Sequence, residues 1–377
     1  MSAGRRSDKS RVESLSSAPS RRRVLRTAAV AGAAVAVGGG LGVVRRVRPP
    51  EDSRGAPGIL PPFLTPIGSF YAFANGPWPS PMGMDSPLRI GSNGMLRDVE
   101  WSEAVPLATD RIIRTLECDG NGYITAEEGT GCRIGGGYPS DPEMSAEHPP
   151  AKHWVWRFGG IGNAEWDTVS VADLFAAFGL PTSGEWLHAV GRDGYRRSFS
   201  RPVALDPAFR VAMGMNGEAL PHDHGAPARL LVPGQYGAMN VKWVQELRFG
   251  GREEPPEGAG GAQTIYEIKP LAFATMPEDR SEVGSGPVEL GGVAFAGAHP
   301  VKEVVLWRGE QTWSAQLVDP PKPYVWTRWR SVVELPPGDH EIRIACIDAS
   351  GRQSVPQKAY GEAVGYGGLH TLRLSRS

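Results

Sequence analysis

Residues 288–346 alternate apolar and polar positions in short runs that are separated by turn signals. Alternation with a period of two places one face of each strand in a core. The runs are Val288–Phe295, Val301–Trp307, Thr312–Val318, Thr327–Leu335 and His340–Cys346. This order predicts a small antiparallel, Ig-like β-sandwich. We expect its core to be filled by Trp307, Trp313, Trp326 and Trp329.

The preceding region mixes strand-like and helix-like patterns. Arg111–Leu116 and Arg229–Val232 are short apolar runs typical of strands. A helix is predicted where apolar residues recur at helical spacing, and Gly179 with Pro181 ends that pattern. The recurring residues are Val171, Leu174, Phe175 and Phe178. The fold class expected for the whole chain is therefore α+β.

Two stretches rich in Pro, Gly and charge divide the chain, one before residue 67 and one at 250–261. We predict a targeting segment over residues 1–48 and a linker over 49–66. A large mixed α/β domain over 67–255 and the sandwich domain over 262–377 follow.

The N-terminal segment has the features of an export signal. Ser20–Arg26 contains consecutive arginines, and the weakly apolar stretch Thr27–Val44 follows. This pattern predicts export by the twin-arginine pathway to the periplasm or another extracytoplasmic compartment. No clean small-x-small cleavage site precedes Arg45, so removal of the segment and its retention as a membrane anchor are both open.

Composition excludes one class of partner. The chain has 377 residues, 40 Lys plus Arg and 41 Asp plus Glu, which gives a formal net charge of -1. Without a basic excess, binding to nucleic acid is not expected. Three cysteines, Cys118, Cys132 and Cys346, are too few for a disulfide scaffold. Pairing of Cys118 with Cys132 is left open.

The turn at Cys118 carries the strongest chemical signal and has two interpretations. A thiolate in the Gly/Asn-rich turn after Arg111–Leu116 is suited to bind a soft metal or attack a substrate. The stretch Glu117–Glu128 also fits a calcium loop, with Asp119 and Asn121 among its ligands.

Six ordered blocks, together with the sandwich that follows them, favour the first of these interpretations. The blocks are Phe70–Pro79, Cys118–Asn121, Gly160–Trp166, Met215–Leu220, His224–Arg229 and Val232–Trp243. In this order they resemble the sulfite oxidase family of molybdopterin-dependent oxidoreductases, including the molybdenum subunit of sulfane dehydrogenases. The resemblance implies a molybdenum–molybdopterin cofactor bound by residues 67–255 and a homodimer formed through the Ig-like domain.

The resemblance also assigns roles to individual residues. It implies that Cys118 ligates the molybdenum and that Tyr195, in a Tyr-x-x-Ser block, lies near the reacting oxygen. Sulfur is a suitable ligand for a soft, redox-active metal. The positions that match contacts to the cofactor are Asn75, His224, Arg229, Asn240, Val241 and Lys242.

The resemblance implies oxygen-atom transfer on a small, sulfur-containing or other substrate. Because the chain has no Cys-x-x-Cys-His haem motif, electrons are expected to pass to or from a separate carrier such as a cytochrome. The family's sulfite-clamping arginines are replaced here by Gly122, Tyr123 and the residues of Phe73–Asn75. Sulfite is therefore not the expected substrate. Two alternatives are a sulfoxide-type reductase on the same scaffold and a non-enzymatic, exported calcium-binding protein.

Overall fold

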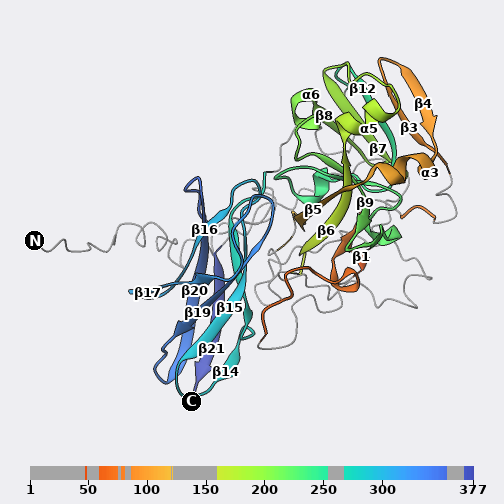
Figure 1. The fold of residues 1–377 in the computed structure, drawn as a ribbon. Helices are drawn as coiled ribbons and strands as arrows, with labels where there is room; N and C mark the ends of the chain where they lie inside the picture. Colours follow the sequence, from red (N-terminus) through yellow and green to blue (C-terminus); the bar gives the residue numbers. More distant parts are fainter. Residues whose placement is uncertain are drawn as a thin grey trace, which may run out of the picture.

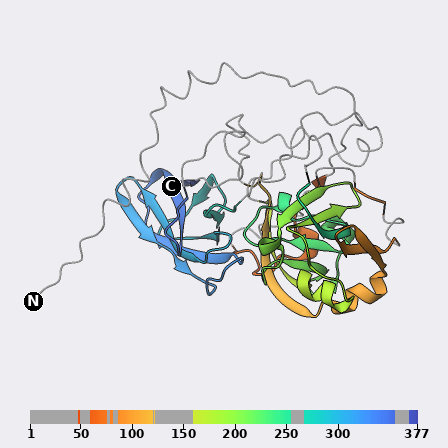
Figure 2. The same ribbon diagram turned by 90° about the horizontal axis from the view of Figure 1, so that it is seen from above.

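The computed structural model describes residues 59–74, 78–80, 86–119, 121, 159–253, 267–354 and 369–377, together with the backbone of Val47 and Arg48. It shows two domains, rich in strands and poor in helix, that lie side by side in both views (Figures 1 and 2). A large mixed domain followed by a β-sandwich confirms the predicted fold class. The predicted export segment lies outside the described residues, apart from the backbone of Val47 and Arg48. Within the described part of the chain, no helix is long and apolar enough to cross a membrane.

Two five-stranded sheets build the larger domain. The first has the order β10–β9–β6–β5, with β11 also paired to β9, and the second has the order β4–β3–β12–β7–β8. The strands of the first sheet are β5 (Asp110–Glu117), β6 (Ile161–Ser170), β9 (Arg210–Met215), β10 (Glu218–Ala219) and β11 (Arg229–Leu231). Those of the second are β3 (Leu88–Ser92), β4 (Met95–Val99), β7 (Trp186–Gly191), β8 (Arg196–Ser200) and β12 (Val244–Gly250). A separate pair joins β1 (Val47–Arg48) to β2 (Ala72–Phe73).

The described helices of this domain are short. They are α3 (Trp101–Ala104), α5 (Val171–Ala177), α6 (Arg201–Ala204) and the 3₁₀ turns η1 (Ile67–Ser69), η3 (Val105–Leu107), η4 (His222–His224) and η5 (Gly237–Met239). Helix α5 confirms the predicted helix: Ser170 caps it by accepting the Asp173 N–H at 3.0 Å, and Gly179 follows its end with a φ of +65°. Its predicted apolar face is buried at Val171, Leu174 and Phe175.

The C-terminal domain is a sandwich of two sheets, ordered β13–β15–β19–β18 and β14–β21–β20–β16–β17. Its strands are β13 (Leu271–Met276), β14 (Ser281–Val283), β15 (Val288–Phe295), β16 (Val301–Arg308), β17 (Gln311–Ser314), β18 (Gln316–Leu317), β19 (Thr327–Val333), β20 (Gly338–Asp348) and β21 (His370–Arg376). The predicted single strand Thr312–Val318 is wrong in one respect. The Ala315 N–H donates to the Val304 carbonyl at 2.9 Å, and the chain then passes from one sheet to the other.

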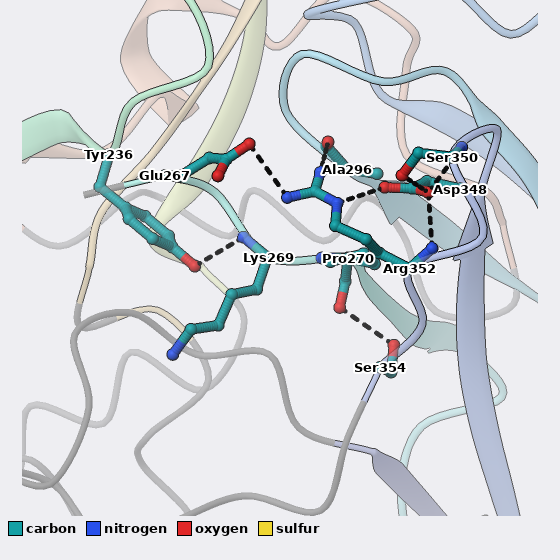
Figure 3. Close-up of polar contacts among 9 residues, drawn as sticks. All are labelled: Tyr236, Glu267, Lys269, Pro270, Ala296, Asp348, Ser350, Arg352 and Ser354. Atoms are coloured by element: carbon teal, nitrogen blue, oxygen red, sulfur yellow. Dashed lines mark hydrogen bonds and ion pairs between the residues drawn. The ribbon is translucent and has the colours of Figure 1, made fainter. Parts of the chain in front are cut away.

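A hydrogen bond and an isolated β-bridge join the two domains beside the loop that leads into η5, and ion pairs within the C-terminal domain lie next to them (Figure 3). The Tyr236 hydroxyl accepts the Lys269 N–H at 3.2 Å. The Arg352 guanidinium lies between Glu267, at 3.1 Å, and Asp348, at 2.8 Å (Figure 3). Because Tyr236 directly precedes η5, the C-terminal domain helps to hold that loop in place.

A second contact between the domains holds the outer edge of β5. The Thr115 N–H donates to the Tyr324 carbonyl at 2.9 Å, and the Thr115 hydroxyl accepts the Trp326 N–H at 2.8 Å. The Trp326 indole N–H donates to the carbonyl of Phe63 at 3.0 Å. Residues 59–66, inside the range predicted as a linker, are thus packed between the domains, with Leu60 and Thr65 buried.

The sequence predicted that the four tryptophans of the C-terminal domain fill one core, but the structure places them in different clusters. Trp329 is fully buried in the sandwich, and Trp313 packs against that core only partly buried. Trp307 belongs to a small separate cluster. Trp326 instead joins an apolar cluster that includes Phe70 and Trp166 of the larger domain together with residues of β13 and β15. The position of Trp326 in a loop, where no strand alternation sets its direction, explains the difference.

Candidate active site

A cavity of the larger domain opens where β5 ends. It encloses about 670 Å³, including the open space at its mouth, which is within the range of cofactor pockets. Six of the predicted site residues line it: Cys118, Tyr195, His224, Arg229, Asn240 and Lys242. The structure therefore brings together side chains that are up to 124 positions apart in sequence (242 − 118).

Backbone and side-chain bonds hold Cys118 in place just after β5. Its N–H donates to the Gly160 carbonyl at 2.8 Å, and its carbonyl accepts the Asn121 N–H at 3.0 Å. The Asn121 side chain completes the turn by accepting the Gly160 N–H at 3.1 Å. Cys118 is only 6% exposed. The turn thus presents a shielded thiol to the cavity.

Glu117, the residue before the cysteine, is a buried carboxyl. Burial raises the pKa of Glu117 to about 8, and the hydrogen bond from Asn121 partly opposes this rise. That bond runs from the Asn121 amide to Glu117 Oε1 at 3.0 Å, while Oε2 has no hydrogen-bond partner. The described members of the alternative calcium loop therefore bond to one another and to Gly160. The remainder of that loop, from Gly122 to Glu128, lies outside the described residues, as does Cys132.

His224, Arg229 and Lys242 form a buried cationic cluster in the cavity wall. They come from η4, the start of β11 and the chain after η5. Each side chain contacts a backbone carbonyl. Arg229 donates a hydrogen bond to the His224 carbonyl at 3.0 Å, and Lys242 donates one to the Asp223 carbonyl at 2.9 Å. His224 Nε2 lies 3.3 Å from the Ile67 carbonyl oxygen. Gly225 permits this packing, because a Cβ atom there would lie 2.9 Å from the Lys242 side chain and 3.2 Å from Arg229.

The described carboxylates nearest to this cluster, Asp193 and Asp223, act on Lys242 without forming an ion pair with it. Burial lowers the pKa of Arg229 to about 10. Burial, followed by repulsion from Arg229, lowers the pKa of His224 to about 4 and that of Lys242 well below its usual range. Within the described ranges, neither Arg229 nor Lys242 forms an ion pair with a carboxylate, and Arg229 Nε is buried without a hydrogen-bond partner. Such a cluster fits an anionic ligand, which would supply the missing charge.

We expect His224 to make a contribution to the stability of the cofactor-free protein that is lost in acid. Its pKa is about 4 in the folded state and about 6.5 in an unfolded chain, so only the unfolded chain takes up the proton between these values. The contribution of His224 is therefore constant above pH 6.5 and falls by about 3 kcal/mol as the pH drops to 4, whereas the raised pKa of Glu117 has the opposite effect on stability over this range. Denaturant unfolding at pH 7 and pH 4 measures this, and His224→Gln should flatten the slope.

His222→Gln is the matched control, since His222 Nε2 also lies against a backbone carbonyl, that of Pro79, at 2.9 Å. Equal pH slopes for the wild type and His224→Gln would contradict the assignment.

The other predicted site residues have different positions. Tyr195 lines the cavity, with its hydroxyl donating to the Ala238 carbonyl at 2.7 Å. Asn240 braces the same loop by accepting the Val232 N–H at 2.7 Å. Val241 does not line the cavity, because its side chain packs in the hydrophobic core, whereas that of the next residue, Lys242, lines the cavity. Asn75 lies outside the described residues.

Sequence reasoning missed several residues that line the cavity. Tyr71 and Phe73 lie within the quoted Phe70–Pro79 block, and Asp119 follows the cysteine directly. Asp193 lies in an Asp-Gly turn between β7 and β8. In the sequence, an Asp-Gly pair predicts a hairpin turn and does not indicate a role in a site. Asp223, between the two histidines of η4, also contributes.

A buried thiol and a buried cationic cluster on one cavity define a class of protein that binds an anionic cofactor together with a soft metal. The oxidoreductase molybdopterin binding domain family matches residues 91–257. This match identifies a molybdopterin-binding domain similar to that of the sulfite oxidase family, and the domain implies a molybdenum–molybdopterin cofactor.

Relatives with known names extend this finding. The chain is 28% identical to human mitochondrial sulfite oxidase over 230 residues, which cover 51% of this chain and 42% of the human protein. It is 27% identical to chicken sulfite oxidase over 328 residues, covering 76% of this chain and 67% of the chicken protein. This chain thus spans less than half of the human relative's length.

A solved structure shows the same fold. The crystal structure of the sulfane dehydrogenase SoxCD from Paracoccus pantotrophus matches 91% of this chain and 92% of its own, with a TM-score of 0.65 and 22% identity. The match extends over the molybdopterin-binding domain and the β-sandwich.

Proposed function

We propose that the protein is an exported molybdopterin-dependent oxidoreductase that transfers an oxygen atom to or from a small sulfur-containing substrate. The observation that carries the proposal is the meeting of the Cys118 thiol and the cationic cluster in one cavity. The twin-arginine pattern supports a periplasmic or extracytoplasmic location, and the Ig-like domain supports a homodimer by family resemblance.

We assign different roles to the described residues of this cavity. Arg229 and Lys242, with His224, hold the anionic part of the cofactor, because each is buried and lacks a carboxylate partner in the described chain. Cys118 supplies a sulfur ligand, held by its bonds to Gly160 and Asn121. The Tyr195 hydroxyl fixes the loop at Ala238 and faces the same cavity. When bound, the molybdenum cofactor supplies two-electron redox chemistry.

The proposed reaction is balanced by water and a separate electron carrier. In the oxidative direction the substrate sulfur gains one oxygen from water, and two protons and two electrons are released. A carrier such as a cytochrome accepts the electrons one at a time. In the reductive direction, a sulfoxide loses its oxygen as water, and the carrier donates the two electrons.

The experiment that tests this function measures molybdenum per chain by mass spectrometry, in protein made by a host that synthesises the cofactor. About one molybdenum per chain is expected, together with turnover of at least one sulfur compound in a screen run in both directions. Absence of molybdenum from folded protein made in such a host would overturn the proposal.

Arg229→Met should change stability and cofactor binding in opposite directions. The substitution removes a buried charge that has no carboxylate partner in the described chain, so we expect the cofactor-free protein to gain about 1–2 kcal/mol in its free energy of unfolding. Loss of a charge-assisted contact should reduce the molybdenum retained after dialysis by more than about 10-fold.

Arg210→Met is the control, since Arg210 pairs with Asp110 at 2.8 Å outside the cavity. If Arg229→Met retained molybdenum like the wild type, Arg229 would have no part in holding the cofactor.

A further inference from the structure

The cavity wall next to Cys118 carries a carboxylate. Asp119 follows the cysteine, lines the same cavity, and its Oδ1 lies 3.5 Å from the Cys118 sulfur. In the described part of the chain, no Arg, Lys or His side chain forms an ion pair with Asp119. A negative charge without a described counter-charge therefore lies beside the proposed metal ligand.

The other groups described near the thiol are uncharged or acidic. A Cβ atom on Gly237 would lie 3.0 Å from the Tyr71 hydroxyl oxygen and 3.7 Å from Cys118 Cα, so this phenol is close to the cysteine. Burial raises the pKa of Tyr71, and the charges of Cys118, Glu117 and Asp119 raise it further, against an opposing effect of Arg229. Phe73 and Ala74 complete this part of the wall.

The cations of the cavity are engaged elsewhere. Lys242 Nζ is bonded to the Asp223 carbonyl and lies 4.2 Å from the centre of the Trp243 ring. The Arg229 guanidinium is bonded to the His224 carbonyl and lies over the Trp166 ring at 5.4 Å. These are the groups that we assign to the anionic cofactor, and their charges are used there. Among the other charged groups that the structure describes here, Arg197 is bonded to Tyr195 and Ala238, and Asp193 and Asp223 lie near Lys242. The charge described beside the thiol itself is that of Asp119.

We propose that Asp119 is a specificity-determining residue that disfavours anionic substrates, so that the enzyme acts on sulfur compounds with no negative charge at the reacting sulfur, such as an uncharged sulfoxide or thioether. The inference rests on the proposed function, whose cavity it uses. An oxyanion about 5 Å from the carboxylate would be disfavoured by roughly 300-fold per unit charge at an effective dielectric constant of about 20. A neutral substrate would experience no such repulsion.

The test compares Asp119→Asn with the wild type as molybdenum-loaded enzymes. Asparagine keeps the size of the side chain and removes its charge. We expect kcat/KM for sulfite, with ferricyanide as electron acceptor, to rise by at least about 10-fold in the variant. The value for dimethyl sulfoxide, with a reduced viologen as donor, should change by less than about 3-fold. Asp98→Asn, on the exposed face of β4, is the control for replacing a surface aspartate.

A binding measurement separates this inference from the proposed function. Titration calorimetry of sulfate into the loaded proteins should show affinity at least about 10-fold higher in Asp119→Asn than in the wild type. If the affinity rises but neither substrate reacts, the charge effect holds and the proposed reaction fails. If sulfate affinity and the ratio of the two kcat/KM values are the same in the wild type and Asp119→Asn, the role of Asp119 is overturned.

Discussion

Cys118→Ser is expected to lower turnover by more than about 100-fold while the protein keeps most of its cofactor. Even changes to residues that only orient a metal ligand typically cost 10- to 100-fold, so replacing the sulfur ligand itself should cost more. Serine offers a harder oxygen that ionises far less readily than a thiol. The cationic cluster is untouched by the substitution and should still hold the anionic part of the cofactor. Steady-state turnover and molybdenum content, measured on the same sample, test both parts.

Cys346→Ala provides the matched control for losing a thiol. Cys346 is fully buried in the core of the C-terminal sandwich, and burial raises the pKa of its thiol far above the usual range. The Cys346→Ala variant should therefore lose some stability and retain turnover. A Cys118→Ser enzyme as active as this control, with molybdenum bound, would exclude Cys118 as a metal ligand.

The strands of the sandwich were predictable because one physical signal sets them. Strand β15 begins and ends at the predicted residues, Val288 and Phe295, because turn residues bound it at Gly286–Pro287 and at Gly297, although residues 290–295 are all buried. Alternation does not show which sheet a strand joins, so the passage of the chain between β17 and β18 at Ala315 was missed. Strand β13 is also missed, because its first residues, Leu271 to Phe273, are all buried and no alternation marks them.

Six of the eight predicted site residues line one cavity, but the geometry of that cavity was not predictable. Cys118, Tyr195 and Lys242 come from separate elements, and no periodicity indicates that they meet; the order of the family blocks supplied that information. The prediction was least informative for residues that directly neighbour a matching position. The side chain of Val241 packs in the hydrophobic core, and Asp119 lines the cavity although it was considered only as a calcium ligand. Side-chain direction in a turn depends on backbone angles that the sequence does not display.

Trp326→Ala should be among the most destabilising single substitutions in the molecule, costing about 3–5 kcal/mol in the free energy of unfolding. Trp326 is 3% exposed and lies in the apolar cluster shared by the two domains. Alanine would leave a cavity between them and would leave the Phe63 carbonyl without its indole donor. Unfolding in denaturant measures the loss, with Trp313→Ala, at a partly exposed position of the sandwich, as the control.

The same substitution should affect the site through β5. The Trp326 backbone N–H donates to Thr115, which lies on β5 three residues before Cys118, and the neighbouring Tyr324 carbonyl accepts the Thr115 N–H. Loosening this contact should allow the strand end to move, and small displacements of a catalytic group lower kcat more than substrate binding. We therefore expect Trp326→Ala to reduce kcat while its molybdenum content stays near that of the wild type, whereas Trp313→Ala changes neither. If both variants lost stability equally and kept full kcat, the C-terminal domain would have no part in positioning Cys118.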